Sequence, residues 1–428
     1  MNRLLFRHAR LLDPASGLNA TGDLLVEGER IAEIGGDLSG AALDAETVMA
    51  QGLCLAPGLV DMRVQLREPG AEHLESIESG GRAAAAGGVT TMVALPNTEP
   101  PVDDVSVVEF LARRAREVKL AKVHTYAAAT KGLRGHELTE MGLLAANGAV
   151  GFTDGVKAVA DALVMRRVLA YARSFDLLVL QHPEEPSLAR AGEVNEGEIA
   201  TRLGLTGITP MAELIIVERD LRLVEITGAR YHAAHVTTGA AIEAIRRAKV
   251  QGLPVTCDTA PPYFVLNETA IGDYRTFAKL SPPLRSEWDR RAVIEGLRDG
   301  TIDAIASDHA PWDQDSKRLP FSSAAYGIVG LETLLALSLE LYHNRHLGLL
   351  ELLRLLTLNP ARILRLPVGC LAVGAPADLV LFDADFSWHI CPDDFRSKSK
   401  NAPFDERPVK GRVQLTIVDG RTIFRHPG

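Results

Sequence analysis

Residues that can bind a metal ion or move a proton follow several apolar runs in the middle of the chain. His182 comes after "LLVLQ", His235 after "RYHAA" and Asp308 after "IDAIAS". Imidazole nitrogens and carboxylates are the ligands that zinc hydrolases use, and a carboxylate beside the ion can serve as a general base. A single histidine at a strand end is commonly a structural hydrogen-bonding group. Two histidines, Asp308 and a second aspartate, Asp154 after "GAVGFT", each at its own strand end, favour a hydrolytic metal centre instead.

The first apolar run, "LCLAPGLV", leads into "DMRVQLREPG", which contains Arg63 and Gln65. Alternate residues of a strand point the same way, so both side chains would face the centre. Neither suits zinc, because a guanidinium stays protonated up to pH ~12 and has no lone pair to give, and an amide oxygen is a poor zinc ligand. We therefore predict that no metal is bound. We expect Arg63 to pair with Asp308 or Asp154 where a metal ion would otherwise lie.

These residues need a scaffold that brings several strand ends together. From about residue 56 to 364, apolar strand-like runs alternate with longer amphipathic stretches such as "VSVVEFLARRAREV" and "AAIEAIRRAKVQG". Repeated βα units with polar residues at the strand carboxyl ends predict an α/β protein, most economically a (β/α)8 barrel of the TIM type. Residues 1–55 and 365–428 contain short strands and turns. We predict that the two ends of the chain together form a small β-sandwich domain beside the barrel.

The composition narrows the class of partner. The chain has 428 residues and a net charge of −9, and its basic residues are dispersed, which argues against nucleic acid as a partner. No run approaches the ~20 apolar residues of a membrane span, so we expect no membrane partner and a cytoplasmic location. The cysteines lack CxxC spacing and are predicted to be reduced and structural; they are Cys54, Cys257, Cys370 and Cys391.

Longer segments carry a family resemblance. The chain resembles dihydroorotase of the amidohydrolase superfamily over nearly its whole length. Allantoinase and hydantoinase belong to the same superfamily, but "REPG", "PPLRS" and "SKSKNAPF" look more like dihydroorotase. The other matching segments include "GGRAAAAGGVTTMVALPNTEPPVDD", "QHPEEPSLARAGEVNEGEIATRLGL", "YHAAHVTTGAAIEAIRRAK" and "GTIDAIASDHAP".

The resemblance implies one or two zinc ions. The family holds them with a His-x-His on the first strand, an acidic or carbamylated-lysine ligand near the fourth, two further histidines, and an aspartate after the eighth strand that is also the general base. Arg63 and Gln65 stand in place of the His-x-His. The positions that match the remaining ligands are Asp154, His182, His235 and Asp308, the last as a vestigial general base.

Arg67 and Asn97 match the family residues that hold the substrate carboxylate, although both could instead cap loops. Other positions depart from the family pattern, which supports the loss of the metal site. Pro262 and Tyr263 replace a histidine pair, and Ser281 replaces an asparagine. Trp312 stands where a histidine or another small polar group is common.

Three functions are compatible with these residues. The first is a non-catalytic, dihydroorotase-like pseudo-enzyme of pyrimidine biosynthesis with no cofactor; the resemblance implies aspartate transcarbamoylase as its structural partner and allows a homo-oligomer. The second is an active cyclic amidohydrolase, a dihydroorotase with a reduced one-zinc site in which Asp308 is the base and Arg67 with Asn97 the carboxylate clamp. The third is a sensor that binds dihydroorotate or carbamoyl-aspartate without converting it.

Overall fold

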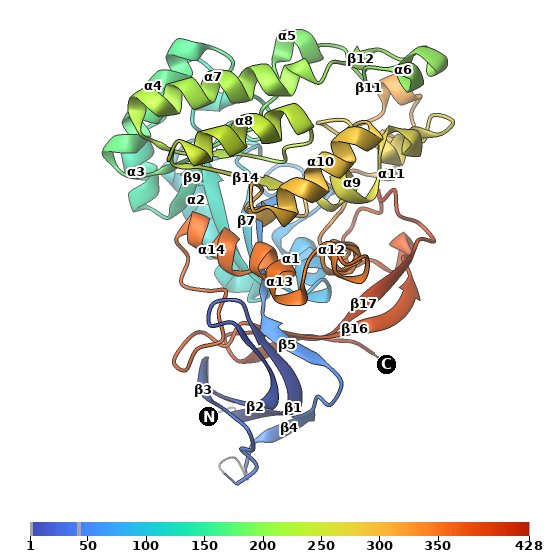
Figure 1. The fold of residues 1–428 in the computed structure, drawn as a ribbon. Coiled ribbons are helices and arrows are strands. Elements are labelled where there is room, and N and C mark those ends of the chain that lie inside the picture. The colour runs from blue at the N-terminus through green and yellow to red at the C-terminus, as the bar shows by residue number, and fades with distance from the viewer. Residues whose placement is uncertain (1–2, 41–43, 428) are drawn as a thin grey trace.

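Eight parallel strands form one continuous sheet (Figure 1). The structure is a computed structural model and describes residues 3–40 and 44–427. In order around the sheet, the strands are β15 (Ala304–Ile305), β14 (Val255–Thr259), β13 (Arg230–Ala233), β10 (Leu178–Gln181), β9 (Ala149–Phe152), β8 (Lys122–Ala127), β7 (Val89–Ala94) and β6 (Leu59–Val64).

The two edges of this sheet meet, so that the sheet is nearly closed into a barrel. A parallel bridge joins Val64, at the end of β6, to His309, just after β15, and the backbone N–H of Gln65 donates to the carbonyl of His309 at 2.9 Å. Every residue of β6 and β7 is buried, as expected for strands covered on both faces. The prediction of a TIM-type (β/α)8 barrel is confirmed.

Helices follow the strands along the chain and surround the barrel (Figure 1). Asp104, Thr238 and Ser286 each begin a helix by accepting a hydrogen bond from a backbone N–H of its first turn. The α-helices are α1 (Ile77–Ala86), α2 (Val105–Val118), α3 (Met141–Ala146), α4 (Ala162–Ser174), α5 (Pro186–Ala189), α6 (Glu198–Leu203), α7 (Met211–Thr227), α8 (Gly239–Val250), α9 (Pro261–Val265), α10 (Glu287–Arg298), α11 (Gln314–Lys317), α12 (Leu334–His343), α13 (Leu349–Leu356) and α14 (Leu358–Leu364). Short 3₁₀ helices cover Lys131–Leu133, Glu268–Ile271, Thr276–Ala278, Phe321–Ser323 and Pro392–Asp394.

The two ends of the chain meet in a second sheet outside the barrel. The first strands (blue) and the last strands (red) lie on the same side of the barrel (Figure 1). In order, the strands are β18 (Arg421–Arg425), β17 (Pro408–Val418), β16 (Leu379–His389), β5 (Cys54–Pro57), β1 (Arg3–Asp13), β2 (Leu18–Glu27) and β3 (Arg30–Gly35), with β4 (Glu46–Met49) paired to β1. A separate two-stranded sheet contains β11 (Val194–Asn195) and β12 (Gly207–Ile208).

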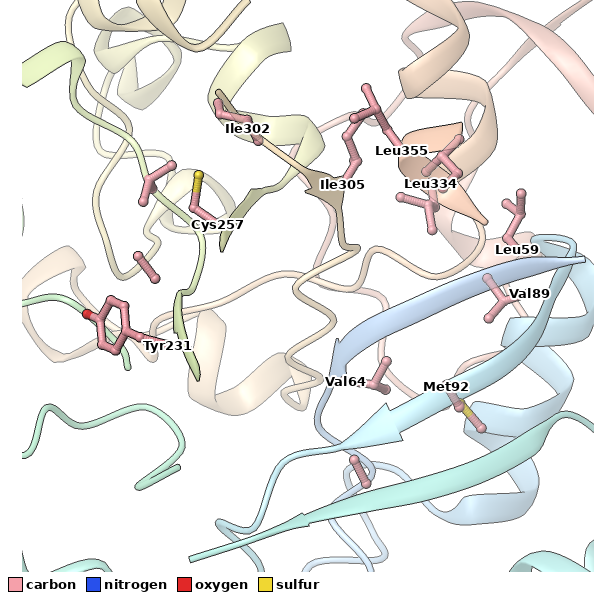
Figure 2. Close-up of a cluster of buried hydrophobic side chains, with 14 of the residues drawn as sticks. Leu59, Val64, Val89, Met92, Tyr231, Cys257, Ile302, Ile305, Leu334 and Leu355 are labelled. Carbon is pink, nitrogen blue, oxygen red and sulfur yellow. The ribbon is translucent and has the colours of Figure 1, made fainter. Parts of the chain in front are cut away.

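Apolar side chains between the barrel strands and the helices form a continuous buried cluster. Figure 2 shows Leu59 of β6 and Ile305 of β15 close to Leu334 of α12 and Leu355 of α13. Burying an aliphatic side chain of this size contributes about 1.5–3 kcal/mol, so this packing fixes the strands whose ends carry the candidate site. Phe382 of β16 belongs to the same cluster, which means that the second sheet and the barrel share a core.

Two further sequence-based expectations concern the surface and the thiols. Among the described residues, no helix is both long and apolar enough to cross a membrane. The cysteines are free thiols: Cys54 and Cys257 are buried, Cys370 is half-buried and Cys391 is exposed. Only the first two therefore have the buried position expected of a structural cysteine.

Candidate functional site

The predicted site residues lie at the carboxyl ends of the barrel strands, where TIM barrels build their sites. Arg63 is on β6 itself, His182 directly follows β10, His235 follows β13 and Asp308 follows β15. Each side chain is buried, and Arg63 is only 1% exposed. The barrel therefore brings residues together that are far apart in the sequence.

A continuous chain of polar contacts runs through the centre. Nε of Arg63 donates to Oδ1 of Asp308 at 2.8 Å. Oδ2 of the same carboxylate lies 2.9 Å from Nδ1 of His235, and Nε2 of His235 lies 2.7 Å from Nδ1 of His182. Both carboxylate oxygens of Asp308 and both ring nitrogens of His235 are therefore in hydrogen-bond contact with other side chains.

Glu184 extends this chain and was not among the predicted site residues. Its Oε2 lies 3.5 Å from Nε2 of His182, and the two groups form an ion pair when the histidine is protonated. The hydroxyl of Ser281, which stands where the family has an asparagine, lies 3.4 Å from the same oxygen. An acid two residues after a strand-end histidine, in "QHPEE", is the signal that could have indicated this contact.

The fixed charges at the centre set the protonation states. Burial alone would raise the pKa of Asp308, but His235 and Arg63 outweigh burial and lower it, so the carboxylate is ionised. Burial, together with the charge of Arg63, lowers the pKa of His235 to about 4. The imidazole is therefore neutral at pH 7, and Arg63 is the cation that faces Asp308.

Three site residues have a left-handed backbone. The φ angle is 59° at Arg67, 38° at His235 and 51° at Asp308, although none of them is a glycine. Such conformations cost about 1–3 kcal/mol each and persist where the surrounding structure fixes them. At His235, the backbone N–H donates to the buried carboxylate of Asp258, which holds the residue in this conformation. The left-handed conformation changes the direction of the chain just after the strand in each case.

The remaining predicted residues contact groups other than a central ion. Oε1 of Gln65 accepts a hydrogen bond from Nδ2 of Asn97 at 2.9 Å, so these two predicted residues satisfy each other. The guanidinium of Arg67 lies over the ring of Trp312, 4.5 Å from its centroid, and its Nε donates to the carbonyl of Pro311 at 3.3 Å. Burial lowers the pKa of Arg67 to about 10, so it remains protonated at pH 7.

Asp154 does not contact Arg63. Its carboxylate accepts hydrogen bonds from the backbone N–H and the hydroxyl of Thr130. Burial raises its pKa, and the bonds from Thr130 oppose that rise only in part. Tyr263, at the position of the family's histidine pair, places its ring 6.5 Å from that of His235 and donates its hydroxyl hydrogen to the carbonyl of Pro282 at 2.9 Å. Of the two partners considered for Arg63, the structure pairs it with Asp308.

This set of donors does not fit a metal ion. Within residues 3–40 and 44–427, no group of three or more histidine, cysteine, aspartate or glutamate side chains is arranged to hold one. A guanidinium, which cannot coordinate, lies against the carboxylate that would be the ligand. The amide of Gln65 is directed to Asn97. The charges of Arg63 and Asp308 neutralise each other in a buried ion pair, and the arrangement offers no open coordination position.

Comparisons with known proteins identify dihydroorotases and the wider amidohydrolase family as similar to this chain. A family model described as dihydro-orotase-like matches residues 52–241, and an amidohydrolase family model matches residues 291–424. A dihydroorotase of Anaplasma phagocytophilum is 48% identical over 98% of this chain and 94% of its own length. A dihydroorotase of Syntrophotalea carbinolica is 46% identical over 99% of both chains. Among solved structures, L-hydantoinase from Arthrobacter aurescens has a TM-score of 0.86 and 25% identity, covering 99% of this chain and 96% of its own.

Proposed function

The chain belongs to the dihydroorotase family, and we propose that it serves pyrimidine biosynthesis without hydrolysing a cyclic amide. The observation that carries this proposal is the buried ion pair between Arg63 and Asp308. In this reading Arg63 supplies the positive charge of the centre, and Asp308 is a structural partner and not a base. The fold of the family is retained and the chemistry of its centre is not.

The ion pair between Arg63 and Asp308 is electrostatically incompatible with a bound metal ion and with Asp308 as a general base. A like unit charge about 4 Å away costs roughly 4 kcal/mol at an effective dielectric constant of about 20, and a divalent ion doubles this cost. A general base works best when its pKa lies near the working pH. The pKa of Asp308 is lowered, and both of its oxygens are engaged by Arg63 and His235. A carboxylate held in this way is a weak base.

The resemblance supplies a role for such a chain, which is that of a structural partner of aspartate transcarbamoylase. A complete barrel joined through a shared core to the second sheet would serve as a scaffold without any turnover. The test is co-purification of the two proteins from the native cell, followed by size-exclusion chromatography of the mixed pure chains. A transcarbamoylase that assembles and works equally well without this chain would contradict the partnership.

A second candidate function is supported by one observation, the 48% identity to a dihydroorotase over 98% of this chain. It is an active dihydroorotase that uses a reduced metal site. Metal content measured by mass spectrometry and a dihydroorotate hydrolysis assay on the purified chain decide between the two. The Asp308→Asn variant is the matched control, because turnover that survives this change comes from a contaminating enzyme. Near-stoichiometric zinc with turnover that Asp308→Asn abolishes would establish the second candidate.

A further inference from the structure

A cavity of about 800 Å³ lies at the amino ends of the barrel strands, the opposite end of the barrel from Arg63. One wall is α2, a second is the start of β8, and a third is the turn between β17 and β18. The cavity therefore lies where the barrel meets the second sheet. Neither the resemblance nor the centre described above gives it a role.

The inner wall of this cavity is apolar. It is formed by Ala115 of α2, by Leu120 just before β8 and by Val123 of β8, which are all partly exposed. His124 of β8 also lines it, and burial together with nearby Lys122 lowers the pKa of His124. That imidazole is therefore uncharged at pH 7 and adds a flat, weakly polar surface to the apolar wall.

The opening of the cavity is cationic. Arg116, Lys119 and Arg421 line it, and among the described residues none of the three has a carboxylate partner. The guanidinium of Arg421 donates a hydrogen bond to the carbonyl of Lys119 at 3.0 Å. Lys122 is neutralised by Asp378 at 2.7 Å and Asp419 at 2.6 Å.

The charge balance of this site differs from that of the chain. The four cations of the lining, Arg116, Lys119, Lys122 and Arg421, are opposed by Glu29 and by the two aspartates that pair with Lys122, which leaves an excess of one positive charge. The whole chain has a net charge of −9. An acidic protein with a local excess of positive charge around an apolar cavity attracts anions to that place.

We propose that this cavity binds a small organic anion that carries an apolar ring and one phosphate or carboxylate group. The ring would lie on Ala115, Leu120 and Val123. The anionic group would face Arg116, Lys119 and Arg421. Guanidinium groups bind both kinds of anion through paired N–H donors. Ligand sites commonly have volumes of about 300–1,000 Å³ and combine apolar walls with a few polar groups. The inference does not depend on whether the centre at Arg63 hydrolyses a substrate.

Isothermal titration of the full chain tests the proposal with three probes. Phenyl phosphate and benzoate share a ring and differ in the anion, and inorganic phosphate has the charge without the ring. We expect one of the ringed probes to bind with a dissociation constant below about 1 mM, the value for a ligand of this size at ordinary efficiency. Inorganic phosphate should bind at least tenfold more weakly. Which ringed probe binds more tightly identifies the natural anionic group.

Substitutions at the opening of the cavity test whether the ringed probes bind there. Arg116→Ala combined with Lys119→Ala should weaken the ringed probe at least tenfold, and Arg421→Ala tests the same opening from another element if that double variant does not fold. Arg166→Ala is the matched control, because Arg166 is an exposed arginine on α4 that does not line the cavity. Arg67→Ala tests whether the probe binds instead at the other end of the barrel, near Arg63. The proposal is overturned if neither ringed probe binds, if Arg67→Ala is the variant that abolishes binding, or if a folded cavity variant binds as the unmodified chain does.

Discussion

Arg63 places a full positive charge in a buried position, and its only carboxylate partner among the described residues is Asp308. Replacing it with methionine, which has a similar length and no charge, leaves Asp308 without its guanidinium partner. Removing one member of a buried pair costs about 3–5 kcal/mol, so Arg63→Met should lower the free energy of unfolding by that amount. Urea denaturation followed by far-ultraviolet circular dichroism measures the change.

The double variant Arg63→Met with Asp308→Asn is the control for this prediction. It removes both charges, so it should recover most of the stability that Arg63→Met loses. A loss below about 1 kcal/mol in the single variant would mean that the ion pair is not what holds the centre together.

In the proposed function, Arg63 and Gln65 are the residues that prevent metal binding. A second prediction therefore concerns the replacement of both with histidine. The change removes the opposing charge and supplies two imidazole donors beside His182, His235 and Asp308. We expect Arg63→His with Gln65→His to retain about one zinc ion per chain after dialysis. Mass spectrometry measures the zinc, and the visible spectrum of the cobalt-loaded protein reports the ligands.

A variant that lacks the new imidazoles, Arg63→Gln with Gln65→Asn, separates the two effects of that change. It removes the charge and should stay free of zinc. Equal zinc retention in the unmodified chain would contradict the proposed function, whereas failure of a folded histidine variant to bind zinc would show only that the old ligand geometry is lost.

Some of the contacts at the site could be predicted from the sequence. The meeting of Arg63 with Asp308 could be, because both lie at the carboxyl ends of strands that converge in a barrel. The pairing of Gln65 with Asn97 and the stacking of Arg67 on Trp312 could not, because they depend on side-chain rotamers and on the course of a loop. In physical terms, the sequence pattern places strand ends, and packing decides which polar groups then satisfy each other.

At the scale of elements, the segment that follows β15 is folded around a buried lysine of α11. Nζ of Lys317 donates to the carbonyls of Ala325 at 2.7 Å and Gly327 at 3.2 Å. Burial, with Lys279 close by, lowers the pKa of Lys317 to about 7. In the unfolded chain this pKa is about 10.4, so between these values the unfolded chain holds a proton that the folded protein has released.

The third prediction is that Lys317 makes stability rise with pH. The free energy of unfolding of the unmodified chain, relative to that of Lys317→Met, should increase between about pH 7 and pH 10. Urea titrations of both proteins at several pH values measure this difference. Lys157→Met, at an exposed position, should show no such trend. A constant difference across the window would mean that Lys317 titrates alike in the folded and unfolded chains.

The elements differ in how far the sequence could predict them. The barrel strands were predictable because each is apolar and is followed by an amphipathic stretch, as in β7 and α2. The pairing within the second sheet was not. β5 lies between β1 and β16, which are more than 300 residues apart, and no periodicity specifies such a long-range neighbour.

At the scale of the whole molecule, the second sheet is not an independent attachment. Phe382 of β16 is fully buried in the cluster that also contains Leu59 and Ile305 of the barrel. A core shared in this way predicts that both parts unfold in one transition, since the packing around Phe382 is lost when either part unfolds. Tryptophans report on the two parts separately: Trp312 lies in the loop after β15, and Trp388 lies on β16.

The fourth prediction uses those two reporters. In variants that keep only Trp312 or only Trp388, fluorescence should give the same urea midpoint, and Phe382→Ala should lower both midpoints together, with a loss of about 3–5 kcal/mol. The barrel reporter would move because the cavity left by the ring lies in packing that the barrel strands share. Ser387→Ala, at an exposed position of the same strand, should leave both midpoints unchanged. If Phe382→Ala shifted only the Trp388 transition, the second sheet would unfold by itself, and the packing at Phe382 would not stabilise the strands that hold Arg63 against Asp308.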